Sequence, residues 1–221
     1  MVGGPEADGR ADGARVVAVL ARAPSAPGKR RLFDALGLAS DPALLAALLL
    51  DTLDGVSVPG VPRLVAVDPP AAVDDVRALV PPGVAVIAQG DGDLGARMRA
   101  LMGAAFAGGA RAVVLVGSDL PDIQPAVVEA AFAALAADPG ALVLGPALDG
   151  GYYLVASTHV PDVFDGVAWG TPSVLDETRA RARAAGLTVR LLPPLRDVDV
   201  PDDLRRVRAP RTSAWVRRGT C

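Results

Sequence analysis

Two short stretches place carboxylates where they could act on a phosphate-bearing substrate. GSDLPD (117–122) presents Asp119 at the end of an apolar run, and RDVDVPDDL (196–204) carries Asp197 and Asp199. Alternate residues of an extended chain point to one side, so the last two acids can face one site. Mg2+ is bound in proteins by one or two carboxylates together with substrate phosphates. The competing interpretation is that each acid caps a nearby helix.

A basic turn supplies the opposite charge. The loop RAPSAPGKRRL (22–32) contains Lys29, the only lysine among 22 basic residues, followed by Arg30 and Arg31. Cations in the first turn of a helix oppose the helix dipole, which favours a phosphate close by. A solvated basic turn is the alternative. The Walker pattern GxxxxGK[ST] is absent from this loop.

A glycine turn and a glycine-rich loop complete the candidate site. In LGPALDGGYYLV (144–155) a tight hairpin is one interpretation. In the other, bare glycine backbone lets an acceptor molecule approach, while the Asp binds the acceptor hydroxyl or acts as its base. Adjacent tyrosines alternate faces, so one of the pair belongs to the core, and the tryptophan of WGTP is a lid or core packing. The candidate acceptor-binding residues are Asp149, Gly150, Gly151, Tyr152 and Trp169.

The stretch QGDGDLGARM (89–98) combines glycines with the start of a helix that Asp93 can cap. We expect Gln89, Gly90, Asp93 and Gly95 to face the base or the ribose of a nucleotide. A plain capped helix is the alternative.

Apolar strands alternating with helical patterns position these loops. Strands are predicted at 16–22, 63–69, 84–90, 112–119, 141–147, 152–157 and 188–193, and helices near 30–51, 71–79, 94–109, 125–137, 172–185 and 203–208. Such apolar strands indicate a mostly parallel sheet covered on both faces, where ligands bind beyond the carboxyl ends of the strands. The 152–157 strand follows its predecessor too closely for a crossover helix, which predicts antiparallel pairing or a place elsewhere in the sheet.

The 221 residues suit one α/β domain, predicted at 15–208 between a disordered segment at 1–14 and a flexible tail at 209–221. One cysteine and one histidine exclude intrachain disulfides, Cys-based metal clusters and multi-histidine sites. A net charge of −3 does not suggest a nucleic-acid partner. No apolar run is long enough to span a bilayer and no signal peptide is visible, so we expect a cytoplasmic protein. The oligomeric state is open.

Six stretches together resemble a known family: GKRRL, QGDGDLGARM, VVLVGSDLPDI, LVLGPALDGGYYLV, VFDGVAWGTPSVLDET and LPPLRDVDVPDDL. Over residues 16–207 they look like the glycosyltransferase-A-like transferases associated with selenodomain or radical-SAM proteins, some of which are labelled arsenosugar biosynthesis glycosyltransferases. A more distant similarity is to 2-phospho-L-lactate guanylyltransferase and the molybdenum-cofactor guanylyltransferases.

The resemblance implies a Rossmann-like three-layer sandwich that binds a nucleotide with Mg2+ or Mn2+. Matched residue by residue, the metal ligands are Asp119 and Asp199, with Asp197 as the competing choice for the second. Lys29 and Arg31 match the Lys and Arg of the family's Lys-Thr-Arg-Leu. The middle Thr is replaced here by Arg, and the preceding loop is shorter.

The combined expectation is a transferase that moves a sugar from a nucleotide-activated donor to a small-molecule acceptor. Lys29 and Asp149 take the catalytic roles, the first by neutralising phosphate charge. The charged GKRR loop also suits a triphosphate, which favours a nucleotidyltransferase that releases pyrophosphate. The third possibility is a nucleotide-binding protein without catalysis, against which the clustered acids argue.

Overall fold

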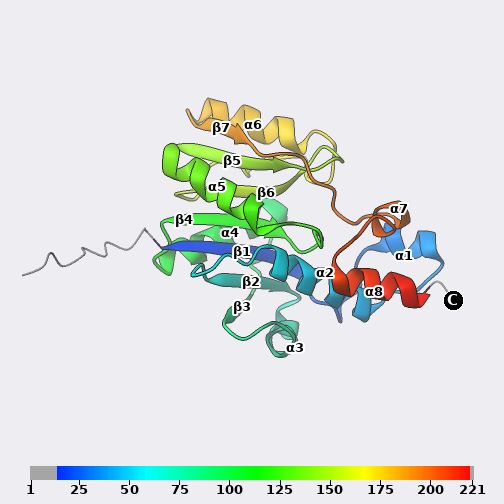
Figure 1. The fold of residues 1–221 in the computed structure, drawn as a ribbon. Coiled ribbons are helices and arrows are strands. Elements are labelled where there is room, and N and C mark those ends of the chain that lie inside the picture. Colours follow the sequence, from blue (N-terminus) through cyan, green and yellow to red (C-terminus); the bar gives the residue numbers. More distant parts are fainter. Residues whose placement is uncertain (1–13, 220–221) are drawn as a thin grey trace, which may run out of the picture.

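β-Branched and other apolar residues form the strands of one sheet in the computed structural model, which describes residues 14–219 (Figure 1). The predicted disordered segment at 1–14 therefore lies outside the described residues, except for its last residue. The strands are β1 (Arg15–Arg22), β2 (Arg63–Asp68), β3 (Val84–Ala88), β4 (Ala112–Gly117), β5 (Ala141–Pro146), β6 (Tyr152–Ser157) and β7 (Thr188–Leu191).

The seven strands are ordered β3-β2-β1-β4-β6-β5-β7. β6 pairs antiparallel with both β4 and β5, and the other described pairs are parallel. This confirms the mostly parallel sheet and the antiparallel pairing of 152–157. The chain runs outward from β1 to β3 and then returns to place β4 on the other side of β1. A crevice is expected at the carboxyl ends of β1 and β4, where the strand order reverses.

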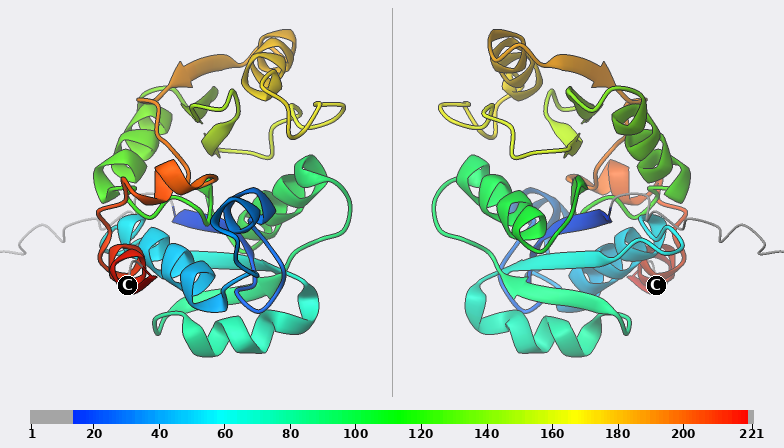
Figure 2. Two further views of the ribbon diagram at one scale, coloured as in Figure 1. Left: turned by 90° about the vertical axis from the view of Figure 1, so that its right-hand side faces the viewer. Right: turned by 90° about the vertical axis from the view of Figure 1, so that its left-hand side faces the viewer.

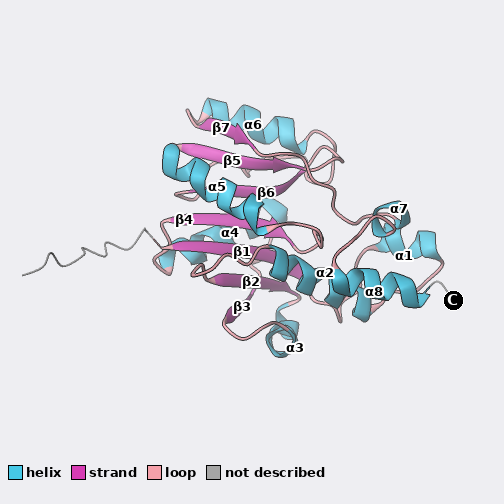
Figure 3. Cartoon of the chain, in the orientation of Figure 1, coloured by secondary structure: helices cyan, strands magenta, loops and turns pink. Residues whose placement is uncertain are grey.

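Helices cover both faces of the sheet, as the views along the strands show (Figure 2). Figure 3 distinguishes the helices from the strands by colour. Buried side chains of α2, α3 and α5 pack on one face, and those of α4 and α6 pack on the other. The predicted three-layer α/β sandwich is therefore confirmed. The helices are α1 (Arg30–Leu36), α2 (Pro42–Gly55), α3 (Val73–Leu79) with a preceding 3-10 turn at Pro70–Ala72, α4 (Leu94–Ala107), α5 (Pro125–Ala137), α6 (Val174–Ala184), α7 (Pro201–Leu204) and α8 (Pro210–Gly219).

The helix predicted over 30–51 is two helices. Gly37, at φ 67°, ends α1 in the left-handed conformation that glycine adopts at little cost. Asp41 then caps α2 by accepting a 2.7 Å hydrogen bond from the amide of Ala43. The break lets α1 leave the sheet and contact α7 beyond the strand ends. No helix in residues 14–219 has the length and apolar character needed to cross a membrane.

The prediction of a flexible tail at 209–221 is wrong, because α8 occupies most of this segment. The buried carboxylate of Asp51 on α2 accepts hydrogen bonds from the amide and the hydroxyl of Thr212, at 2.8 and 2.9 Å. Asp122 accepts from the amide of Ala209 at 2.7 Å, just before the helix begins. Asp122 is distant in sequence from α8, so a local capping signal for this helix is missing from the sequence.

Candidate active site

The lone lysine lies between two acids that come from different loops. Lys29 Nζ is 2.8 Å from Asp119 Oδ2 and 2.6 Å from Asp199 Oδ1. The lysine side chain is only 9% exposed, whereas the two carboxylates are 38% and 39% exposed. Burial acts to lower the pKa of Lys29, but the two carboxylates outweigh it and raise the pKa above its usual value. The ammonium therefore stays charged and holds the two acids together.

The backbone of Lys29 is strained. It caps the start of α1 at φ 51° and ψ 42°, in the left-handed region. Among residues 14–219 it is the one non-glycine residue with a positive φ. A non-glycine residue stays in this region only when its surroundings hold it there, and such positions gather at functional sites. The double ion pair is the contact that holds Lys29.

The acidic loop after β7 is fixed from two sides. The amide of Val198 donates to the carbonyl of Asp119 at 3.1 Å, and its side chain is buried against α1 and α2. The carboxylate of Asp203 accepts from the amides of Asp199 and Val200, at 3.1 and 3.0 Å. With Val198 packed inward, its two acidic neighbours turn toward the site, as their alternation predicted.

Asp149, Asp197 and Asp199 form an acidic triad in which one carboxylate oxygen from each lies within 4.8 Å of the others. Asp149 joins this group from the turn after β5, although the sequence placed it on the acceptor side alone. Asp119 is not in the triad but lies beside it through Lys29. Burial, and next the charge of Asp199, raise the pKa of Asp197 to about 6. An all-oxygen, like-charged donor set of this kind fits Mg2+ or Mn2+.

The raised pKa of Asp197 predicts a pH-dependent gain in stability for Asp197→Asn. A carboxyl whose pKa is higher in the folded state costs stability as pH rises from its ordinary value of 3.8 through about 6. In metal-free buffer at pH 7.5 we expect the variant to be more stable by about 1 kcal/mol, a figure reduced for the partial exposure of the group. At pH 4 the difference should vanish.

Denaturant unfolding in EDTA at the two pH values measures this difference. Asp75→Asn, an exposed change on α3, is the control. Equal stabilities of Asp197→Asn and wild type at pH 7.5 would contradict the prediction that burial and neighbouring carboxylates make the ionised Asp197 unfavourable.

Two cavities meet at this site, with volumes of about 310 and 350 Å3. The first is lined by Arg22, Lys29, Asp68, Gln89 and Arg97, at the carboxyl ends of β1, β2 and β3. The second is lined by Arg31 of α1 and by residues of other loops, namely Asp149, Gly151, Trp169, Thr171 and Asp197. Both cavities share Leu94, Met98, Gly117, Asp119, Tyr152 and Tyr153. Asp119 is the acid common to both, and Asp149 and Asp197 lie beside it in the second cavity.

Of the four residues predicted to face a nucleotide, Gln89 lines the first cavity. Its amide nitrogen donates to the carbonyls of Ala21 and Ala66, at 2.7 and 3.1 Å, and so braces the ends of β1 and β2. Asp93 caps α4 by accepting from the amide of Ala96 at 2.8 Å. This is the plain capped helix that was the alternative interpretation.

The two glycines predicted to face the nucleotide are packing positions. A Cβ on Gly95 would lie 2.9 Å from the indole ring of Trp169, and one on Gly90 would lie 3.1 Å from Ala100 Cβ. Gly90, Asp93 and Gly95 line neither cavity. The glycines let α4 pack closely against its neighbours, including the 164–172 loop, and the nucleotide contacts of the three residues stay a prediction.

Gly150 packs against its own chain and is not free for an acceptor. Its φ is 93°, and a Cβ there would lie 2.2 Å from the carbonyl oxygen of Pro172. The carbonyl of Gly150 also accepts from the amide of Leu175 at 3.0 Å. Asp149 Oδ1 accepts from the amide of Gly151 at 2.9 Å, so the motif is also a local turn. The acceptor role predicted for Gly150 is corrected, while Asp149 and Gly151 do line the second cavity.

The two tyrosines divide as the alternation predicted. Tyr153 is 5% exposed and fits over Gly145, where a Cβ would lie 2.3 Å from the tyrosine ring. Tyr152 lines both cavities and meets Trp169 edge to face, with ring centroids 6.3 Å apart. Burial raises the pKa of Tyr152. Trp169 lines the second cavity while packing on α4, so it combines the two roles considered for it.

Sequence analysis missed Asp68 and Arg97 in the first cavity. Asp68 is the last residue of β2, much as Asp119 comes shortly after the end of β4. Arg97 Nη1 lies 3.3 Å from the carboxylate of Asp68. The signal was present in RLVAVDP, where an acid follows an apolar strand. It was overlooked because no second acid or glycine-rich turn accompanied it.

Comparisons with known proteins identify solved structures that resemble this architecture. A crystal structure from Desulfovibrio desulfuricans G20, provisionally named a nucleotide-diphospho-sugar transferase, is 31% identical with a TM-score of 0.78, covering 93% of this chain and 94% of that one. A nucleotidyl transferase from Methanothermobacter is 17% identical with a TM-score of 0.62, covering 94% of this chain and all of the other. CMP:2-keto-3-deoxy-manno-octonic acid synthetase complexed with CTP is 18% identical with a TM-score of 0.58, covering 93% and 99%.

The two more distant structures share the fold, which is that of nucleotidyltransferases and glycosyltransferase-A-like enzymes. A search of curated protein sequences returns no match. Residues 52–171 match the family model described as "Uncharacterized protein conserved in bacteria (DUF2064)". Because that match spans more than half of the 221 residues, the chain belongs to the DUF2064 family.

Proposed function

We propose that this protein is a Mg2+- or Mn2+-dependent transferase that moves a sugar from a nucleotide-activated donor to a small-molecule acceptor. The observation that carries the proposal is the acidic triad, two of whose members line the second cavity, beside Asp119, which lines both cavities. The provisional name of the 31% identical relative supports a nucleotide-diphospho-sugar donor. The resemblance of its motifs to the selenodomain- and radical-SAM-associated transferases further supports the proposal.

The metal would be held by Asp149, Asp197 and Asp199, with Asp119 beside them, and would supply positive charge to the donor phosphates. Lys29 fixes Asp119 and Asp199 in one arrangement and adds its own charge at the same point. Arg31 lines the second cavity without an ion pair among the described residues, so its guanidinium is free to bind phosphate oxygens.

The acceptor would lie in the second cavity against Trp169 and Tyr152. Asp149 is the exposed member of the triad and lines this cavity. It is therefore placed to accept a hydrogen bond or a proton from an acceptor hydroxyl. The aromatic wall excludes water from one side of the reacting groups.

A binding panel with Asp199→Asn tests the proposal. The full chain is titrated with UDP, GDP, ADP, CDP, UDP-glucose and GDP-mannose, in Mg2+ or in EDTA. We expect at least one of these nucleotides to bind only with Mg2+, and Asp199→Asn to weaken that binding about tenfold or more because one charged ligand is lost.

Asp202→Asn is the matched control, since Asp202 lies three residues further on in α7, is exposed, and pairs with Arg205 outside the triad. It should bind as wild type does. Absence of binding by every nucleotide, or equal affinity in EDTA and in the Asp199 variant, would refute the proposal.

A nucleotidyltransferase is the second candidate, favoured by the adjacent exposed cations Arg30 and Arg31. Neither forms an ion pair in residues 14–219, which leaves two guanidinium groups for a third phosphate. Product analysis separates the two reactions. Sugar transfer releases a nucleoside diphosphate from a nucleotide sugar, whereas nucleotidyl transfer releases pyrophosphate from a nucleoside triphosphate.

A further inference from the structure

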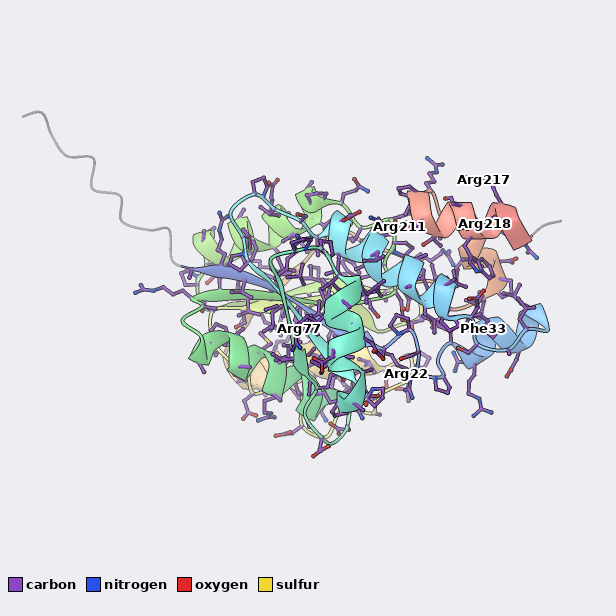
Figure 4. All side chains as sticks on the ribbon, turned by 90° about the horizontal axis from the view of Figure 1, so that it is seen from below. Arg22, Phe33, Arg77, Arg211, Arg217 and Arg218 are labelled. Atoms are coloured by element: carbon purple, nitrogen blue, oxygen red, sulfur yellow. The ribbon has the colours of Figure 1, made fainter. Side chains whose placement is uncertain are left out.

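Three charged side chains line the first cavity at the ends of adjacent strands. Asp68 ends β2, Arg22 ends β1 beside it, and the two are register partners in the sheet. Arg97 comes from α4 on the β3 side, where its Nη1 lies 3.4 Å from the side-chain oxygen of Gln89. The carboxylate therefore lies between two guanidinium groups, in the order Arg97, Asp68, Arg22. Figure 4 labels Arg22.

Direct contacts hold this row together. Asp68 Oδ2 is 3.3 Å from Arg97 Nη1 and 3.7 Å from Arg22 Nη1. Arg97 is further fixed by donating from Nε to the carbonyl of Gly92 at 3.0 Å. The amide nitrogen of Gln89 is occupied by two backbone carbonyls, so its oxygen is left to face Arg97. Both guanidinium contacts are to the same carboxylate oxygen, Oδ2.

The position of this row in the cavity indicates which part of a nucleotide would contact it. β2 lies two strands from β4 in the sheet order, so Asp68 and Asp119 are separated by two strand spacings, or about 10 Å. Lys29 and the triad, which would hold the metal that binds the donor phosphates, lie at the β4 end. If the proposed function holds, the donor phosphates lie at that end and the nucleoside reaches toward Asp68.

We propose that Asp68, flanked by Arg97 and Arg22, selects a base with an imide edge, which is uracil or its 5-methyl analogue thymine. The row presents donor, acceptor, donor. The imide edge presents a carbonyl, an N–H and a second carbonyl, which is the complementary order. The carboxylate accepts from N3–H, and each guanidinium donates to one carbonyl oxygen.

Each of the other bases would place an acceptor against the carboxylate or a donor against a guanidinium of this row. Cytosine turns the N3 lone pair toward the carboxylate. Guanine turns an amino group toward one guanidinium, and adenine opposes the row with its N1 lone pair and amino group. An unpaired or opposed polar group in a partly buried site costs affinity, so mismatches weaken these bases.

Nucleoside diphosphates test this assignment with the full chain in Mg2+. Wild type should bind UDP and dTDP at least about tenfold tighter than CDP, ADP or GDP, the size of effect that one charged hydrogen bond supports. Asp68→Asn offers an N–H in place of one acceptor oxygen, so it should reduce UDP affinity about tenfold and narrow or invert the UDP-to-CDP ratio. Asp75→Asn, the exposed change on α3, should leave the ratio intact.

Each outcome separates the base assignment from the proposed function. If no diphosphate binds, the proposed function fails and the base assignment fails with it. If wild type binds the five diphosphates equally, or if Asp68→Asn weakens all of them by one factor, Asp68 contacts the ribose or only braces the arginines, and the assignment is wrong while the proposed function stands. The melting temperature of Asp68→Ala is measured as a control. An unchanged value shows that loss of this carboxylate does not cause a folding defect.

Discussion

Lys29→Ala should eliminate transfer and lower the free energy of unfolding by about 2–3 kcal/mol. The substitution removes the cation between Asp119 and Asp199 and leaves two carboxylates facing each other. The expected cost is at the low end for a buried pair because both carboxylates are partly exposed. Denaturant unfolding at pH 7.5 and a product assay measure the two effects.

The same variant should bind Mn2+ more tightly in the absence of nucleotide, because the ammonium no longer competes for Asp199. Two controls separate charge from backbone. Arg30→Ala removes an adjacent exposed cation and should change neither stability nor metal affinity. Lys29→Gly loses the same charge but adopts φ 51° freely. Lys29→Gly should therefore be less destabilised than Lys29→Ala by about 1 kcal/mol, the cost of a Cβ at positive φ. If Lys29→Ala is as stable as wild type, the double ion pair does not stabilise the fold.

Gly150→Ala should destabilise the fold by about 3 kcal/mol or more, by adding backbone strain to a steric clash. A Cβ at this position would lie 2.2 Å from Pro172 O and 2.6 Å from Pro172 Cα. The 172–175 segment would have to move, and α6 begins there. The measurement is the free energy of unfolding by denaturant.

Gly170→Ala provides the matched control. Its φ of 80° is similar, but a Cβ there meets nothing within 4 Å. Only the conformational term remains, which is about 1 kcal/mol. Similar losses in the two variants would show that Gly150 does not pack against Pro172.

The strands could be predicted from the sequence because their apolar, β-branched runs are local signals. The same holds for the antiparallel strand, whose short connection excludes a crossover helix. Helix α8 could not be predicted in this way, since Asp51 and Asp122 stabilise its start from distant parts of the chain. The division of the first long helix was visible in Gly37 and Asp41, but the apolar run around them masked both signals.

At the site, residue types and spacing predicted that Lys29, Asp119 and the DVD acids would occupy one end of the sheet. They could not predict which groups pair. The triad requires the turn after β5 to meet the loop after β7, and the tight fit of Gly150 requires Pro172. Both are contacts between segments distant in sequence, and no local pattern encodes them.

The order in which the chain is synthesised has a consequence for the double ion pair of Lys29. Its partner Asp199 follows it by 170 residues. The buried side chains of Leu32 and Leu44, on α1 and α2, are covered by Val198 and Leu204 from the same late segment. Until its last part emerges, a nascent chain can therefore pair the ammonium with Asp119 alone and leaves the apolar face of α1 and α2 uncovered. An apolar face that stays uncovered favours aggregation, so release before that point is expected to lower the yield of folded protein.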